Sequence, residues 1–298
     1  MFKLDKKLKV GIVGATGMVG QRFITLLENH PWFELVCLAA SPRSAGKSYE
    51  EAVAGRWKMD TPIPEAVKSM IVYDASEVQT VAEQVDFIFS AVDMDKDAIR
   101  ALEDEYAKAE CPVVSNNSAH RWTEDVPMVV PEINPEHYEV IKYQKERLGT
   151  KRGFVAVKPN CSIQSYTPVL TAWKKFEPKE VVVTTYQAIS GAGKTFNEWP
   201  EMVGNIIPFI GGEEEKSEQE PLKLWGKVED GVIKKSDCMT ITSQCIRVPV
   251  LDGHTAAVFV NFATKPSKEE LIQALKDFSG KPQELELPSA PKQFIQYL

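Results

Sequence analysis

The sequence predicts an α/β protein of two domains: a doubly wound parallel sheet over residues 1–157, then an α+β domain over 158–298 with a mostly antiparallel sheet. Three observations lead to this fold class. The chain has 298 residues, which is more than one hydrophobic core usually organises. Short apolar runs alternate with helical patterns in the first half, as in β-α-β units. In the second half, β-branched runs come without a helix between each pair.

In the first domain, apolar runs that end in small residues predict buried parallel strands, and apolar residues three or four positions apart predict helices. The strands are expected over 8–13, 34–40, 85–92 and 112–115, with helices over 18–29 and 99–109. Because helical crossovers join the strands, the expected sheet is parallel and of the Rossmann type.

The second domain reads differently. One long helix is expected over 163–176, and a charged helical stretch opens at 211–216. Runs rich in β-branched residues predict strands over 181–189, 241–250 and 255–263.

Composition excludes several classes of protein. The net charge is −7 without a basic run, which argues against nucleic acid as a partner. No apolar stretch is long enough for a membrane span, and the charged N-terminus lacks the apolar core of a secretion signal. The five cysteines are odd in number and contain no C-x-x-C, so neither a disulfide framework nor a zinc site is expected. A reduced, cytoplasmic protein fits these features.

Four glycines at three-residue spacing, Gly11, Gly14, Gly17 and Gly20, lie between the first strand and the first helix. Glycines there let the backbone approach a pyrophosphate, which rests on the N–H groups of the helix start. The spacing differs from G-x-G-x-x-G, and an ordinary glycine-rich turn is the alternative. The position between strand and helix favours a dinucleotide loop. The residues predicted to hold the cofactor here are Gly14, Thr16, Gly17, Met18 and Val19.

The end of the second strand indicates which dinucleotide. An NAD site usually places Asp or Glu there to bind the ribose 2′-hydroxyl. This chain has Ser41, Arg43, Ser44 and Lys47 instead, and no acid. A guanidinium and hydroxyls suit a 2′-phosphate, so NADP is predicted, with a solvated turn as the alternative.

Cys161 follows Pro159 and Asn160 directly before the expected helix. A thiol at a helix N-terminus has its pKa lowered by the helix dipole, which enriches the thiolate. Thiolate and nicotinamide together imply attack on an aldehyde, loss of hydride to the cofactor and a thioester on sulfur. A lone cysteine is more often part of a core, so the setting carries this prediction.

His254 follows Asp252 and Gly253 in an expected turn between two strands. A thiol mechanism needs a base within hydrogen-bond reach, and His254 is the candidate, although a turn histidine is usually just exposed. His30 and His137, beside prolines in polar stretches, read as surface residues.

Six motifs resemble those of aspartate-semialdehyde dehydrogenases in order and spacing, and they span nearly the whole chain. The sequences of two segments, Asn-Asn-Ser-Ala-His-Arg and Gly-Gly-Glu-Glu-Glu-Lys, are more similar to the archaeal and fungal branch than to the enterobacterial one. The six motifs are Gly11–Gly20, Ala39–Lys47, Ser115–Arg121, Pro159–Gln164, Tyr186–Gly193 and Arg247–His254.

The resemblance implies a role for each site residue. Cys161 would be the nucleophile, Gln187 would orient the substrate, and His254 would take the thiol or thiohemiacetal proton. Arg247 would bind the substrate carboxylate through two parallel hydrogen bonds. Glu213 would bind the substrate ammonium, with Glu214 and Glu215 as open alternatives. Phosphate would be bound by Arg121, Lys216 and Asn160. The nicotinamide end of the cofactor would lie against Ser190, Gly191 and Gly193, and Ser90 and Ala91 would be further cofactor contacts.

The implied reaction is the NADP-dependent conversion of L-4-aspartyl phosphate to L-aspartate 4-semialdehyde, and its reverse, in lysine, threonine and methionine biosynthesis. The second domain would then serve catalysis and dimerisation in a homodimer or homotetramer. The family usually continues with a segment that returns to the nucleotide domain. This chain stops at Leu298, so a truncated or incompletely recorded chain is expected.

Two other functions remain open at this stage. Another acyl-thioester reductase on the same scaffold, such as malonyl-CoA reductase or N-acetylglutamyl-phosphate reductase, would share the nucleophile. A non-catalytic NADP-binding sensor would use the first domain alone, and would leave Cys161, Gln187, Arg247 and His254 unexplained. The substrate-binding candidates favour a small amino acid.

Overall fold

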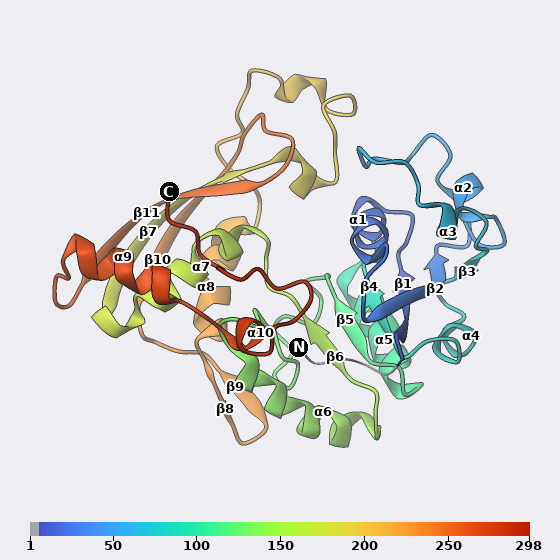
Figure 1. Ribbon diagram of the computed structural model, residues 1–298, viewed down its shortest axis with the longest axis horizontal. Coiled ribbons are helices and arrows are strands. Elements are labelled where there is room, and N and C mark those ends of the chain that lie inside the picture. The colour runs from blue at the N-terminus through green and yellow to red at the C-terminus, as the bar shows by residue number, and fades with distance from the viewer. Residues whose placement is uncertain (1–5) are drawn as a thin grey trace. The chain divides into compact units, whose positions relative to one another are not determined.

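The computed structural model describes residues 6–298, which form two compact units (Figure 1). The six-stranded unit comprises the described part of Lys3–Pro127 together with Tyr138–Lys158. The three-stranded unit comprises Met128–His137 and Pro159–Leu298. The segment Met128–His137 therefore leaves the first unit and packs with the second.

The sheet of the six-stranded unit is parallel throughout and has the order β3-β2-β1-β4-β5-β6. This confirms the doubly wound sheet predicted from the sequence. Its strands are β1 (Leu8–Val13), β2 (Phe33–Ala40), β3 (Val72–Asp74), β4 (Phe87–Ser90), β5 (Val113–Ser115) and β6 (Val155–Val157). The strand order reverses between β1 and β4, and ligands of such sheets bind at this switch point.

Helices join these strands, and the first of them follows the glycine-rich loop. The core beside β1 is apolar. The buried Tyr49 hydroxyl donates to the carbonyl of Ala15 at 2.9 Å and so fixes the loop to this core. The helices are α1 (Met18–Leu27), α2 (Tyr49–Ala52), α3 (Glu65–Lys68), α4 (Val78–Ala82), α5 (Lys96–Lys108) and α6 (Ile141–Leu148).

The three-stranded unit is built on a mixed sheet of order β10-β7-β11. Its strands are β7 (Pro178–Gln187), β10 (Thr240–Arg247) and β11 (His254–Phe262). β11 runs antiparallel to β7, as expected, but β10 runs parallel to it. The reason is that the segment between β7 and β10 contains α8 (Glu213–Leu224), which gives the chain the length of a crossover. The small hairpin of β8 (Lys227–Glu229) and β9 (Val232–Lys234) is antiparallel.

The expectation of one helix over 163–176 is wrong. Ser162–Ser165 is a single 3₁₀ turn, α7 covers Thr167–Ala172, and a second 3₁₀ turn covers Lys174–Phe176. Pro168 lies in the first turn of α7, where a missing N–H costs nothing but where the preceding turn cannot continue as α-helix. Cys161 therefore precedes one 3₁₀ turn rather than a long helix, and the dipole it experiences is smaller than predicted.

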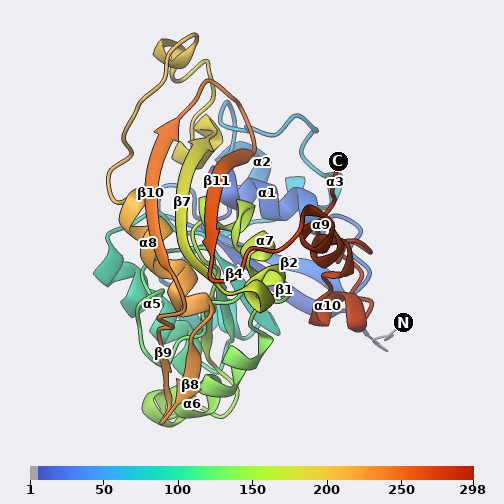
Figure 2. The same cartoon turned by 90° about the vertical axis from the view of Figure 1, so that its left-hand side faces the viewer.

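One face of the three-stranded sheet is open (Figure 2). In that view β10, β7 and β11 lie in front, with α7 and α8 behind them. Val182, Tyr186 and Phe259 project from the open face with 52%, 38% and 75% of their surface exposed. The unit is completed by α9 (Lys268–Asp277) and α10 (Lys281–Glu284). Among residues 6–298, no helix has the length and apolar character of a membrane span.

Candidate active site

The strand register of the three-stranded sheet places three predicted site residues in one row. Gln187 at the end of β7 is paired with Arg247 on β10 and with His254 on β11. Residues paired across adjacent strands share a face of the sheet, so the three side chains start from one side. The expectation that His254 lies in the turn is wrong, because it is the first residue of β11.

Cys161 lies against this row. Its Sγ is 3.2 Å from Nε2 of His254, although 93 positions separate the two residues. On the other side of the ring, the backbone N–H of Ala188 donates to Nδ1 at 3.0 Å. A nitrogen that accepts this hydrogen bond carries a lone pair, so the ring's proton lies on Nε2 and points at the sulfur.

Arg247 is buried, with 6% of its surface exposed, and its guanidinium is hydrogen-bonded to the backbone. Its Nη1 donates to the carbonyl of Ala188 at 2.7 Å. Burial lowers the pKa of Arg247, and the negative charges of Glu213 and Cys161 oppose that shift. A Cβ on Gly191 would come within 3.0 Å of Nη1 of Arg247 and 3.1 Å of the His254 ring, so Gly191 leaves the space that these two side chains share.

Glu213 connects the cluster to α8. Its carboxylate accepts hydrogen bonds from Nζ of Lys216 at 2.7 Å, from Nε2 of Gln187 at 3.0 Å and from Nδ2 of Asn160 at 2.9 Å. Burial alone would raise the pKa of Glu213, but these hydrogen bonds together hold it below its usual value. Glu213 is thus the glutamate that faces the cluster, whereas Glu214 is half-buried and Glu215 is exposed.

The five cysteines lie in different surroundings, and all five are among the described residues. Cys161 is the exposed one, and Cys238 is half-buried. Burial raises the pKa of the Cys37 thiol to about 11 and that of Cys111 to about 12. Burial also raises the pKa of Cys245. Burial therefore disfavours the thiolate at Cys37, Cys111 and Cys245, whereas the sulfur beside His254 is accessible.

The glycine-rich loop of the six-stranded unit is tightly packed at two of its glycines and open at a third. Gly14 has a φ of +94°, and a Cβ there would lie 2.3 Å from the carbonyl oxygen of Ala91. Gly20 is equally crowded, 2.3 Å from the oxygen of Gly14. Gly17 differs, since the nearest atom to its Cβ would be 3.7 Å away. The protein itself does not fill the space over Gly17, and within the described residues no side chain caps α1, which leaves its first N–H groups for an anion.

Other predicted cofactor residues differ in accessibility. Ser41 and Arg43 are exposed after β2, whereas Ser44 is buried to 2%. Ser90 is buried, and its hydroxyl accepts from Nδ2 of Asn117 at 3.1 Å. Arg121 also belongs to the six-stranded unit, where its Nε donates to the carbonyl of Lys158 at 3.1 Å.

Two features, one in the site and one outside it, were not predicted from the sequence. Ala188 contacts both His254 and Arg247, but through its backbone, which no side-chain pattern reveals. His137 is fully buried rather than on the surface, because Nε2 approaches the carbonyl of Gly226 at 3.1 Å and Asn134 contacts Nδ1 at 3.0 Å. Burial accordingly lowers the pKa of His137.

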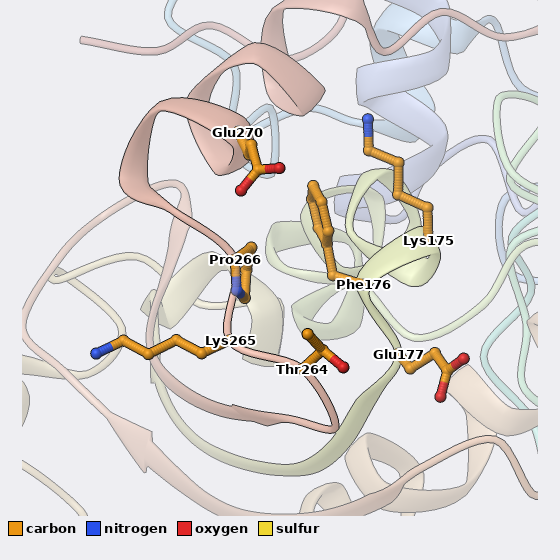
Figure 3. A pocket seen from close by; sticks show the side chains of 7 residues that line it. All are labelled: Lys175, Phe176, Glu177, Thr264, Lys265, Pro266 and Glu270. Atoms are coloured by element: carbon orange, nitrogen blue, oxygen red, sulfur yellow. The ribbon is translucent and has the colours of Figure 1, made fainter.

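A separate hollow of about 250 Å³ lies at the other end of the three-stranded sheet (Figure 3). It adjoins the start of β7 and the end of β11, roughly 25 Å along the strand from His254 at the usual rise per residue. Figure 3 shows the amino end of Lys265 and the carboxylate of Glu177 extending to opposite sides. Its lining residues are Lys175, Phe176, Glu177, Thr264, Lys265, Pro266 and Glu270. None of the predicted site residues borders it.

Comparison with known proteins identifies the family. Residues 9–141 match the family model described as semialdehyde dehydrogenase, NAD binding domain, and residues 168–297 match its dimerisation domain. An aspartate-semialdehyde dehydrogenase of Methanothermobacter thermautotrophicus is 44% identical over 96% of this chain and 80% of its own length. The Cryptococcus neoformans enzyme is 40% identical over 97% of this chain and 80% of its own length. The chain belongs to the aspartate-semialdehyde dehydrogenase family.

Solved structures of the family agree with this assignment. The Candida albicans aspartate-semialdehyde dehydrogenase, solved with NADP, superposes with a TM-score of 0.85 at 37% identity, covering 97% of this chain and 81% of that one. A Vibrio cholerae aspartate-semialdehyde dehydrogenase II complexed with ASA has a TM-score of 0.68 at 25% identity, covering 92% and 80%. The resemblance inferred from the motifs, including its archaeal and fungal character, is confirmed at the level of the family.

Proposed function

We propose that this chain catalyses the NADP-dependent interconversion of L-4-aspartyl phosphate and L-aspartate 4-semialdehyde through a thioester on Cys161. The observation that carries the proposal is the 3.2 Å contact between Sγ of Cys161 and Nε2 of His254, beside one buried guanidinium and one buried carboxylate. A thiolate next to a ring N–H is the arrangement that acyl transfer through sulfur needs. The family relatives named above support the choice of substrate.

In the direction of reduction, the Cys161 thiolate attacks the acyl carbon of aspartyl phosphate. The new C–S bond forms as the bond to the phosphate oxygen breaks, and inorganic phosphate leaves. NADPH, when bound, would supply the hydride that reduces the thioester carbon. Breaking the C–S bond then releases the aldehyde and returns the thiolate.

His254 acts on sulfur mainly as a hydrogen-bond donor in this proposal. Because Ala188 donates to Nδ1, the neutral ring presents Nε2–H to Cys161 and stabilises the thiolate that attacks and later leaves. To accept a proton at Nε2, the ring would have to place its proton on Nδ1 and give up the Ala188 contact. The predicted acid/base role of His254 thus requires a change of partner at Nδ1 during the cycle.

Substrate recognition follows from the charges around the sulfur. The Arg247 fork offers two parallel N–H groups to the substrate's free carboxylate, and Gln187 orients the group beside the nucleophile. Glu213 carries the negative charge that an ammonium requires. Lys216, Asn160 and Arg121 are each proposed as phosphate ligands.

The cofactor proposal depends on the glycine-rich loop and the turn after β2. The open space over Gly17 and the uncapped start of α1 fit a pyrophosphate. Ser41 and Arg43, exposed where NAD enzymes usually have an acid, fit a 2′-phosphate. The NADP complex of the Candida albicans relative supports this choice. Thr16, Met18, Val19, Ser44, Ser90, Ala91, Ser190, Gly191 and Gly193 remain proposed cofactor contacts.

We further propose that the chain forms a homodimer, alone or within a dimer of dimers, in the cytoplasm. The open face of the three-stranded sheet lies within the region that matches a dimerisation domain. It exposes Val182 paired with Phe259, and Tyr186 further along β7. Burial of such apolar side chains is the usual driving force of subunit association. Five free cysteines agree with a reducing compartment.

A steady-state assay tests the proposed activity. The purified protein should reduce NADP when aspartate semialdehyde and inorganic phosphate are both present, and mass spectrometry should detect aspartyl phosphate. Malonyl-CoA and N-acetylglutamyl phosphate should support no NADPH oxidation above background. Turnover with either of these and none with aspartate semialdehyde would replace the proposal by one of the related acyl reductases. NADP binding without any turnover would instead favour the sensor.

A further inference from the structure

One face of α8 is directed at the turn that carries Cys161. Glu213, Ser217 and Glu220 are spaced i, i+4 and i+7 on this helix, so they lie on one side of it. All three are buried, with exposures of 9%, 0% and 1%. The Tyr166 hydroxyl donates a hydrogen bond to the backbone carbonyl of Ser217 at 2.7 Å, which connects the far end of the turn to the helix.

Asn160, the residue before the nucleophile, is held from both ends by this face. Its side-chain amide donates to Glu213 at 2.9 Å, and its backbone N–H donates to Oε2 of Glu220 at 2.6 Å. Its own Oδ1 accepts from the backbone N–H of Ser162 at 2.8 Å, on the other side of Cys161. The backbone on both sides of Cys161 is therefore fixed through Asn160.

The negative charge of Glu220 would not help Cys161 to form a thiolate. A buried negative charge near a sulfur disfavours the thiolate, so electrostatics alone would make Glu220 a disadvantage to the nucleophile. Its geometric effect has the opposite sign, because a buried carboxylate that accepts an N–H bond fixes the backbone strongly. The two effects predict different outcomes when the charge alone is removed.

We propose that Glu220 is a positioning residue, whose carboxylate fixes the Asn160 N–H and thereby holds Sγ of Cys161 in line with His254. This inference depends on the proposed function, since it takes Cys161 as the nucleophile. Glu220 touches neither the substrate nor the cofactor in this role and acts through Asn160. An acceptor at position 220 is what the role requires, and the negative charge is secondary.

The test compares Glu220→Ala with Glu220→Gln in the full chain. Glu220→Ala removes the acceptor and should lower kcat on the order of 100-fold, the effect of misplacing a reacting group by about 1 Å. Glu220→Gln keeps an oxygen acceptor, though a weaker, uncharged one, and should recover most of that loss, leaving kcat about three- to tenfold below the original. The KM for NADP should stay within about threefold in both variants, because neither Glu220 nor Asn160 is a proposed cofactor contact.

Glu218 on the same helix provides a matched control. Its Oε1 also accepts a backbone N–H, that of Ser243 on β10, at 3.0 Å, away from the nucleophile. Glu218→Ala and Glu218→Gln should keep the original kcat, even where the thermal midpoint falls by as much as in the Glu220 variants. If Glu220→Ala fails to fold, Glu220→Gln against Glu218→Gln remains decisive, with a severalfold loss of kcat expected in the first alone.

Equal kcat losses in Glu220→Ala and Glu220→Gln would overturn the inference, because an acceptor at position 220 would then not restore kcat, and so would an original kcat in either Glu220 variant. Iodoacetamide labelling of the unchanged protein, read by mass spectrometry, separates this failure from failure of the proposed function. Fast labelling at Cys161 with unaffected Glu220 variants overturns only the role of Glu220. Fast labelling at another cysteine overturns the nucleophile itself.

Discussion

The glycine-rich loop and the row of Arg247, Gln187 and His254 are the two regions of the proposed site, and they are constructed in different ways. The loop is a run of ten residues in which the backbone is proposed to bind the ligand. A Cβ added at Gly14 or Gly20 would lie 2.3 Å from a backbone oxygen, so both positions require glycine. The row draws its side chains from three strands, and Cys161 joins it from 93 positions away in the chain. The first region is one contiguous segment, whereas the second is assembled by strand register. Substitutions should therefore affect stability at the loop and chemistry at the row.

Replacing the nucleophile should show the largest effect on the row. Cys161→Ser should fold normally yet lose kcat on the order of 10³-fold or more, because an alkoxide forms far less readily than a thiolate. Stopped assays of aspartate semialdehyde oxidation measure the loss, and the thermal midpoint serves as the control for folding. Cys161 should also be alkylated faster than Cys37 or Cys111, whose raised pKa values and burial protect them. Appreciable turnover by the serine variant would show that the nucleophile lies elsewhere.

The loop is probed by a pair of glycine substitutions. Gly14→Ala should cost about 3 kcal/mol or more in stability, since it combines a φ of +94° with a Cβ 2.3 Å from the Ala91 oxygen. Gly17→Ala meets nothing closer than 3.7 Å and should leave the free energy of unfolding nearly unchanged.

The difference between the two glycines concerns the cofactor. Gly17→Ala should still weaken NADP binding, measured by fluorescence titration, because its methyl group enters the space proposed for the pyrophosphate. Urea unfolding measures stability for both variants. Unchanged NADP affinity in Gly17→Ala would show that the open space over Gly17 is not the phosphate site.

Arg247→Lys tests whether geometry, and not only charge, matters in the row. Lysine keeps the positive charge but loses one of the two parallel bonds to a carboxylate, so kcat/KM for aspartate semialdehyde should fall at least tenfold, roughly 1.4 kcal/mol. Lysine also lacks the fork that reaches the Ala188 carbonyl, so a small fall of the thermal midpoint is expected. The rate of Cys161 alkylation should stay the same. Near-normal kinetics would make Arg247 a structural strand residue.

This comparison also explains how far the sequence could predict the molecule. The parallel sheet, the glycine-rich loop and the residues of the row follow from motifs that are contiguous in the chain. The tautomer of His254 and the role of Ala188 do not, because they depend on backbone groups brought close by register. Pro168 divided the helix expected after Cys161, and α8 returned β10 parallel to β7, where a pattern of isolated runs suggested antiparallel strands. Local chemistry was thus predictable, and long-range pairing only in part.

Arg43→Ala should give the smallest effect and tests the cofactor end of the comparison. Arg43 is exposed after β2, so its contact with a 2′-phosphate would be screened by water, and the loss should lie near the low end of a charge-assisted bond, about 1 kcal/mol. KM for NADP should rise roughly fivefold at that energy, whereas KM for NAD, which lacks the phosphate, should hardly change. The free energy of unfolding should be unaffected, because Arg43 is exposed and its side chain is not packed in the core. Raising the salt concentration should shrink the difference between the original protein and the variant for NADP alone. Equal losses for both cofactors, or a difference that salt leaves unchanged, would place the 2′-phosphate away from Arg43 and point to Ser41 and the neighbouring backbone as its ligands.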